Sequence, residues 1–142
     1  MAGVLTTAGI RSLGVFNGTV QNWLKSLTLR LYVNPHSPAV GDGSGAYTQA
    51  SFPGYAPFAW TTWGAPVLDA NNNDQYTAPD ATFTCSGGGA VQNVYGYYAT
   101  DGGGAVVFAE DNGLSGGRPM LNAGDAYIIA GNFYSGQLAG PA

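Results

Sequence analysis

The chain has 142 residues, which suits one domain and allows a sizeable core without disulfides or a structural metal. Only 8% of the residues are charged, whereas 23 glycines, 8 prolines and 13% aromatic residues are typical of a folded domain rich in turns. The glycines follow no three-residue period, which excludes collagen, and no window of 18 apolar residues predicts a membrane span.

The charges are unevenly distributed. Residues 1–30 contain Arg11, Lys25 and Arg30 and no acid, whereas residues 31–142 contain eight acids and one base, Arg118. Four basic residues are too few for a surface that follows a phosphate backbone, so we expect no nucleic-acid partner. The first residues also lack the basic start and the continuous apolar stretch of a secretory signal.

The N-terminal part of the chain divides into an arm and a short helix. Residues 1–15 are small, apolar and interrupted by glycines, and we expect an arm that is neither a strand nor a stable helix. From Phe16 the apolar residues recur with helical spacing, which predicts a short helix over 16–27. We expect this helix to lead into a single β domain that extends from residue 16 to residue 142.

After the helix the apolar period changes to two. Apolar residues alternate with other residues from position 27 to position 33, which predicts a half-buried strand that ends at Asn34-Pro35 and a loop over 34–45. Further strands are expected near 46–52, 56–63, 65–69, 81–86, 91–100, 104–110 and 125–134. About eight strands with almost no helix predict an all-β, antiparallel domain, either a sandwich with a jelly-roll-like arrangement or a barrel-like fold.

Two glycine runs fall between expected strands. Gly87–Gly89 and the segment from Asp101 to Gly104 lack the following helix and the lysine of a phosphate-binding loop. We therefore interpret both runs as hairpin tips.

Few residues could carry catalysis. Cys85 is in phase with Phe83 on an expected strand, which favours a small buried hydrophobe over a nucleophile. His36 lies between prolines in a polar loop that we expect to be exposed. Glu110 and Asp111 are adjacent on a strand, so they point to opposite faces and cannot form the facing pair of a glycosidase. We expect no enzymatic activity, no catalytic residue and no cofactor.

Residues 69–80 contain the one pattern that is typical of a metal site. Asp69, Asn71 and Asn73 match positions 1, 3 and 5 of a calcium loop, and Asp80 stands at position 12. Position 6 is an aspartate where glycine is needed, and position 12 lacks the usual glutamate. We therefore favour an ordinary loop without a metal, with calcium binding as the open alternative.

The aromatic residues between positions 47 and 63 allow two interpretations. They are Tyr47, Phe52, Tyr55, Phe58, Trp60 and Trp63. The favoured interpretation places these rings in the core or at a subunit interface. In the other interpretation, exposed rings beside asparagine and aspartate form a platform on which sugars stack.

The N-terminal segment is the strongest candidate for a partner surface, because its apolar residues precede the first convincing strand. The predicted interface residues are Ile10, Arg11, Leu13, Phe16, Val20, Trp23, Leu24 and Lys25. The alternative is that the segment packs across the chain's own sandwich as a cover.

The order of motifs over residues 16–134 resembles a known class of proteins. A short helix with Trp23-Leu24 is followed by a strand sequence at 27–34 (LTLRLYVN) and a proline loop. Further motifs lie at 50–56 (ASFPGYA), 81–85 (ATFTC), 94–99 (VYGYYA) and 123–129 (AGDAYII). This order is similar to that of small virion proteins of tailed bacteriophages, some of which are decoration, or cement, proteins. The arm at 1–15 is not part of the resemblance.

The resemblance implies a structural function on the exterior of a phage capsid. It implies a cement protein that clamps neighbouring major capsid protein subunits, with further copies of the chain, most simply a homotrimer, as its other partner. It implies no membrane partner. The alternative function is a carbohydrate-binding adhesion module on a head fibre or tail tip, which would use the aromatic residues at 47–63.

Overall fold

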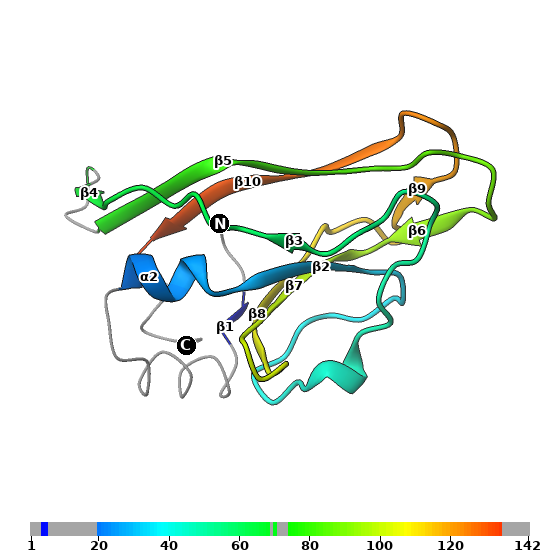
Figure 1. Cartoon of the computed structure of the whole chain (residues 1–142). Helices are drawn as coiled ribbons and strands as arrows, with labels where there is room; N and C mark the ends of the chain where they lie inside the picture. Colours follow the sequence, from blue (N-terminus) through cyan, green and yellow to red (C-terminus); the bar gives the residue numbers. More distant parts are fainter. Residues whose placement is uncertain (1–3, 6–19, 69, 71–73, 135–142) are drawn as a thin grey trace.

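The computed structural model describes residues 4–5, 20–68, 70 and 74–134, which form an all-β domain of antiparallel sheets (Figure 1). The strands are β1 (Val4–Leu5), β2 (Thr28–Tyr32), β3 (Phe58–Ala59), β4 (Val67–Leu68), β5 (Asp74–Thr84), β6 (Gln92–Val94), β7 (Gly96–Thr100), β8 (Val106–Asp111), β9 (Arg118–Met120) and β10 (Ala126–Tyr134). A helix, α2 (Val20–Lys25), precedes β2, and a 3-10 turn, η1 (Ser44–Ala46), follows it. The expected fold class is confirmed.

Two sheets pack against each other like the layers of a sandwich. One has the order β1-β8-β7-β2-β3 and the other the order β10-β5-β4, while β6 and β9 form a small separate pair. Figure 1 shows β5 and β10 as a long ribbon that runs along the sheet containing β2 and β7. The sheets are not closed into a barrel, and the main core contains side chains from both layers, such as Leu31 and Phe108 from one and Phe83 and Phe133 from the other.

The five-stranded sheet is covered on its second face as well. Leu29 and Leu31 of β2 enter the main core, whereas Tyr32 joins a separate buried cluster with Tyr47 and Tyr98. This second cluster contains ring pairs, among them Tyr47 and Tyr98, which stack with centroids 4.8 Å apart. Both faces of β2 and β7 are therefore buried, which explains why β7 is buried along its whole length.

Several predicted strands occur where they were expected, but others differ from the prediction. The stretch at 46–52 forms no strand beyond an isolated bridge between Gln49 and Tyr32. The stretch at 91–100 divides at Tyr95 into β6 and β7, and β9 was not predicted because it has only three residues, one of them a proline. The arm contains a strand after all, since Val4 and Leu5 pair with Ala109 and Phe108 of β8.

Strand β5 begins seven residues earlier than predicted and contains Pro79. The register with β10 shifts there, because Ile129 faces Ala81 whereas Gly131 faces Ala78, so β5 has an extra residue at Pro79 and Asp80. A bulge is one of the few places where a strand tolerates a proline. A Cβ atom on Gly131 would overlap the carbonyl oxygen of Ala78, so this close crossing requires glycine.

The hairpin prediction is correct for one of the two glycine runs and wrong for the other. The turn from Asp101 to Gly104 joins β7 and β8 in one hairpin, and the Asp101 carboxylate accepts hydrogen bonds from the N–H groups of Gly103 and Ala105, both at 3.0 Å. The prediction is wrong for Gly87–Gly89, which connects β5 and β6 in different sheets.

The helix is shorter than the predicted 16–27 at its C-terminal end. Helix α2 ends at Lys25, and the next two residues form a turn in which Ser26 N–H donates to Trp23 and Leu27 N–H donates to Leu24. Residues 16–19 lie outside the described residues. Over the described ranges, no helix is both long enough and apolar enough to cross a membrane.

Candidate functional site

The structure buries two of the eight predicted interface residues in the chain's own core. Trp23 and Leu24 are each 1% exposed and belong to the main core, where the Trp23 ring meets the edge of Phe133 with centroids 6.1 Å apart. They therefore offer no surface to a partner. Val20 packs partly buried against the same core, and Lys25 is half-buried. The other four predicted residues, Ile10, Arg11, Leu13 and Phe16, lie outside the described residues.

The aromatic residues between positions 47 and 63 belong to the interior. The four rings that are fully buried are those of Tyr47, Phe52, Trp60 and Trp63. Tyr55 and Phe58 are partly buried and pack against the main core. The core interpretation is confirmed, and these six rings do not form an exposed stacking platform.

The side chains of the single cysteine and the single histidine both form contacts that belong to the fold. Cys85 is buried as predicted, and its Sγ accepts a hydrogen bond from the Gly87 N–H at 3.4 Å. His36 is not the exposed residue that was expected: its Nε2 lies 2.7 Å from Oδ2 of Asp42, and its side chain is 29% exposed. The ring also meets the ring of Tyr47 edge-on, with centroids 5.1 Å apart.

Asp42 is the centre of this loop network. Its Oδ2 also accepts a hydrogen bond from the Tyr47 hydroxyl at 2.7 Å and one from the Ala39 N–H at 2.8 Å. Desolvation acts to raise the pKa of Asp42, but the hydrogen bonds from His36, Ala39 and Tyr47 together hold it below its ordinary value. Burial, followed by the hydrogen bond with Asp42, raises the pKa of Tyr47, so its hydroxyl stays protonated and donates. The network closes the loop over the second buried cluster.

The segment at 69–80 is only partly described. Asp74 to Asp80 lie in β5 rather than in the predicted loop, whereas Asp69, Asn71 and Asn73 lie outside the described residues. Among the side chains that the structure places, no three from His, Cys, Asp and Glu form a group that could hold a metal ion.

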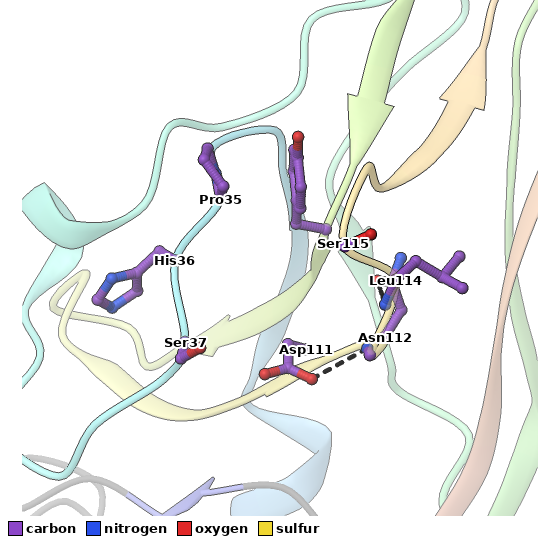
Figure 2. Close-up of a pocket in the computed structure, with 9 residues that line it drawn as sticks. Pro35, His36, Ser37, Asp111, Asn112, Leu114 and Ser115 are labelled. Carbon is purple, nitrogen blue, oxygen red and sulfur yellow. Dashed lines mark hydrogen bonds between the residues drawn. The ribbon is translucent and has the colours of Figure 1, made fainter.

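A first hollow of about 300 Å³ lies beside the end of β8 (Figure 2). The loop at 35–37 and the turn at 111–115 line it, together with Tyr95. The polar side chains of this turn are bonded to its own backbone. Asp111 accepts a hydrogen bond from the Gly113 N–H at 3.0 Å, and Asn112 accepts one from the Leu114 N–H at 3.1 Å. Figure 2 shows the His36 ring directed away from Asp111, so the two do not form an acid–base pair.

A second hollow of about 170 Å³ lies between the two sheets, beside the last residues of β8 and the edge strand β10. Tyr97 and Glu110 line it from β7 and β8, and Tyr127, Ile129 and Asn132 line it from β10. Tyr97 and Glu110 are direct partners in the β7–β8 register. This is the location at which an ionisable group and an aromatic hydroxyl share an interior space, and sequence analysis missed it.

Tyr97 has an unusual environment in this second hollow. Its side chain is 5% exposed, and among the described groups its hydroxyl has no hydrogen-bond partner. Burial, and then the charge of Glu110, raises the pKa of Tyr97, so the phenol is neutral at ordinary pH. A buried polar group without a partner is rare in native proteins and indicates a place for a water, an ion or a ligand.

Three exposed apolar side chains lie on strands of the three-stranded sheet. Val67 and Leu68 of the edge strand β4 are 69% and 65% exposed, and Ile128 of β10 is 59% exposed. Strand β4 pairs with the start of β5, whereas Ile128 pairs with Thr82 near its end, so these side chains occupy two separate positions along the ribbon. Exposed apolar side chains on a sheet are typical of contact surfaces.

The comparisons with known proteins give no relatives: no protein-family model, no curated protein and no solved structure matches the chain significantly.

Proposed function

We propose that the protein is a structural component of a phage virion, a decoration protein that binds the capsid exterior and clamps neighbouring major capsid subunits. The proposal starts from the motif order at 16–134 and from the all-β fold that the same residues form. The observation that supports the proposal most is the pair Val67 and Leu68, which expose apolar side chains on an edge strand. An edge strand has free backbone groups, so a partner can gain both hydrogen bonds and apolar contacts there.

The architecture suits a clamp. A cement protein stabilises the assembled shell because it binds the assembled form and not the separated subunits, and this requires a domain that keeps its shape. The buried rings, the closed loop network at Asp42 and the β7–β8 hairpin provide such a rigid body. A closed cyclic homotrimer matches the three-fold positions of an icosahedral shell. In this proposal β4 contacts the major capsid protein or a second copy.

The copy number in purified particles tests the proposal. Quantitative mass spectrometry should give hundreds of copies per particle, and a particle map should place them on the outer surface. A few tens of copies or fewer at a fibre or tail tip would favour the carbohydrate-binding adhesion module. Absence from the particle would overturn both functions.

A surface variant tests the role of β4 directly. The double substitution Val67→Ser and Leu68→Ser should weaken binding to capsids at least tenfold and leave the melting temperature unchanged. Leu114→Ser is the matched control, because Leu114 is also an exposed aliphatic residue but lies in the turn after β8. Equal binding by the double variant and the control would show that β4 is not the docking strand.

A further inference from the structure

Strand β10 forms one edge of the three-stranded sheet and lacks the features that usually protect an edge. The order β10-β5-β4 leaves one side of β10 without a neighbouring strand among the described residues. The strand has nine residues, whereas the other edge strands, β1, β3 and β4, have two each. Residues 126–134 (AYIIAGNFY) contain no charged residue and no proline. Natural edge strands are usually short or carry a lysine, a proline or a bulge, so β10 is the described edge that is most open to a further strand.

Every second residue of β10 directs its backbone groups away from β5. The Cys85 N–H donates to the Asp125 carbonyl at 2.7 Å, so Asp125 points toward β5, and this direction alternates along an antiparallel strand. The N–H and C=O groups at positions 126, 128 and 130 therefore point to the free edge. The extra residue of the bulge belongs to β5, so the alternation along β10 continues without a break.

The space beside this edge is hollowed along its length. Arg118 of β9 reaches one end of the edge, where its Nε donates to the Ala126 carbonyl at 3.0 Å, in agreement with the outward direction of that group. A depression of about 220 Å³ lies there, and the second hollow of about 170 Å³ follows along residues 127–132. Within the described part of the chain, the outward groups of Ile128 and Ala130 have no hydrogen-bond partner.

The charge distribution favours a second copy of the chain as the partner. The chain has a formal net charge of −4, so a contact between copies is favoured where neither surface is charged. Strand β10 meets this condition with itself, and Ile128 and Ala130 expose apolar side chains on its outer face. The acids beside the second hollow, Glu110 and Asp111, belong to β8 in the other sheet and not to the pairing edge. Two identical antiparallel strands also present matching donors and acceptors to each other.

We propose that β10 pairs with β10 of a second copy, in antiparallel orientation about a two-fold axis at Ile129. In this register Ile128 faces Ala130 of the second copy, and the two residues exchange both of their backbone hydrogen bonds. The large side chain of Ile128 then lies beside the small side chain of Ala130 on the outer face. The inference does not rest on the proposed virion function, because β10 and β4 are opposite edges of the sheet and a three-fold contact would use another surface.

Sedimentation equilibrium of the full-length protein tests the pairing. The mass should rise with concentration to that of an even number of chains. Ile128→Lys places two like charges across the axis and should weaken this association at least tenfold, without a change in melting temperature, because the side chain is exposed. Thr82→Lys is the matched control, since Thr82 faces Ile128 from β5 and is also exposed, but lies one strand away from the edge. A mass of one or three chains at every concentration, or equal association of the two variants, would overturn the proposal.

The same measurement separates this contact from the proposed function of β4. The double substitution Val67→Ser and Leu68→Ser changes the opposite edge of the sheet and should leave the self-association unchanged. Loss of self-association in this double variant would assign the contact to β4 and overturn the pairing of β10. Failure of the copy-number test would overturn the virion function and leave the pairing of β10 unaffected.

Disulfide cross-linking tests the register. Residue 128 of one copy should lie directly opposite residue 130 of the other, with Cα atoms about 5.5 Å apart, which permits a disulfide. Two copies of residue 128 are offset by two positions, roughly 7 Å along the strand, and cannot be bridged. A mixture of Ile128→Cys and Ala130→Cys should therefore form a covalent pair on oxidation, whereas each variant alone should not; the native Cys85 is buried. Cross-linking of the mixture that does not exceed that of either variant alone would overturn the axis at Ile129.

Discussion

His36 Nε2 lies 2.7 Å from the Asp42 carboxylate and ties together two positions of the loop that follows β2. Asp42 accepts two further hydrogen bonds, from Ala39 and Tyr47, so one carboxylate holds three points of the loop. The loop in turn covers the buried pair of Tyr32 and Tyr47. The only histidine of the sequence is therefore a structural element of this loop.

Replacement of Asp42 should destabilise the protein. Asp42→Ala leaves the Tyr47 hydroxyl and the His36 ring without their acceptor, and the loss of a hydrogen-bonded carboxylate of this kind costs about 1–3 kcal/mol. Urea unfolding at neutral pH, followed by tryptophan fluorescence, measures the difference. Asp80→Ala is the control and should change the free energy of unfolding by much less. A difference of less than about 0.5 kcal/mol for Asp42→Ala would show that the network does not stabilise the loop.

The same network should make the free energy of unfolding depend on pH in the acidic range. The pKa of Asp42 is lower in the folded protein than in the unfolded chain, so its contribution is complete above the unfolded pKa and is lost as pH falls through the folded pKa. We expect the stability gap between the unaltered protein and Asp42→Asn to be constant from pH 7 to pH 5 and to shrink below about pH 4. A gap that widens in acid would contradict the sign of this pKa shift.

Trp23 should be essential for the fold of the single chain. Because Trp23 is fully buried against Phe133, Trp23→Ala removes a large part of the core and should cost about 3–5 kcal/mol. Circular dichroism and urea unfolding measure the loss. Lys25→Ala, on the same helix but half-buried, should change stability by less than about 1 kcal/mol. A well-folded Trp23→Ala chain that has lost only self-association would restore the original interface interpretation.

Removal of divalent cations should not affect stability. Asp74 and Asp80 would be positions 6 and 12 of a calcium loop, but both lie in β5, where six residues at about 3.3 Å each separate them by roughly 20 Å. They cannot share one ion. We expect equal melting temperatures in EDTA and in calcium. A calcium-dependent rise in melting temperature that Asp80→Asn removes would establish a metal site in this segment.

The sequence predicts best the elements that depend on local pattern. The alternation at 27–33 predicted β2, and Asp101 with three glycines predicted the β7–β8 turn, because period and turn chemistry act over a few residues. Pro79 concealed the first half of β5, because a proline normally ends a strand, whereas here it lies in a bulge between Ala78, which faces Gly131, and Ala81, which faces Ile129.

The candidate site depends on relationships that no local pattern contains. Trp23 and Leu24 form the same apolar helical face whether that face meets the chain's own core or a partner, so the sequence could not distinguish the two. Tyr97 lies in a run of small and aromatic residues that indicates only a buried strand. Its hydroxyl has no hydrogen-bond partner among the described residues, and its neighbours in the hollow come from β8 and β10, which only the packing of the two sheets brings together.

The last prediction concerns the edge of the five-stranded sheet. Val4 and Leu5 pair with Ala109 and Phe108, so β1 covers the outer edge of β8. An exposed edge strand has free N–H and C=O groups that pair with other chains. A chain that lacks residues 1–5 should therefore associate more strongly than the full-length protein, with a mass that rises with concentration in size-exclusion chromatography with light scattering. A chain that lacks only residues 1–3 keeps β1 and is the matched control. Identical masses for the two truncated chains at all concentrations would show that β1 does not protect this edge.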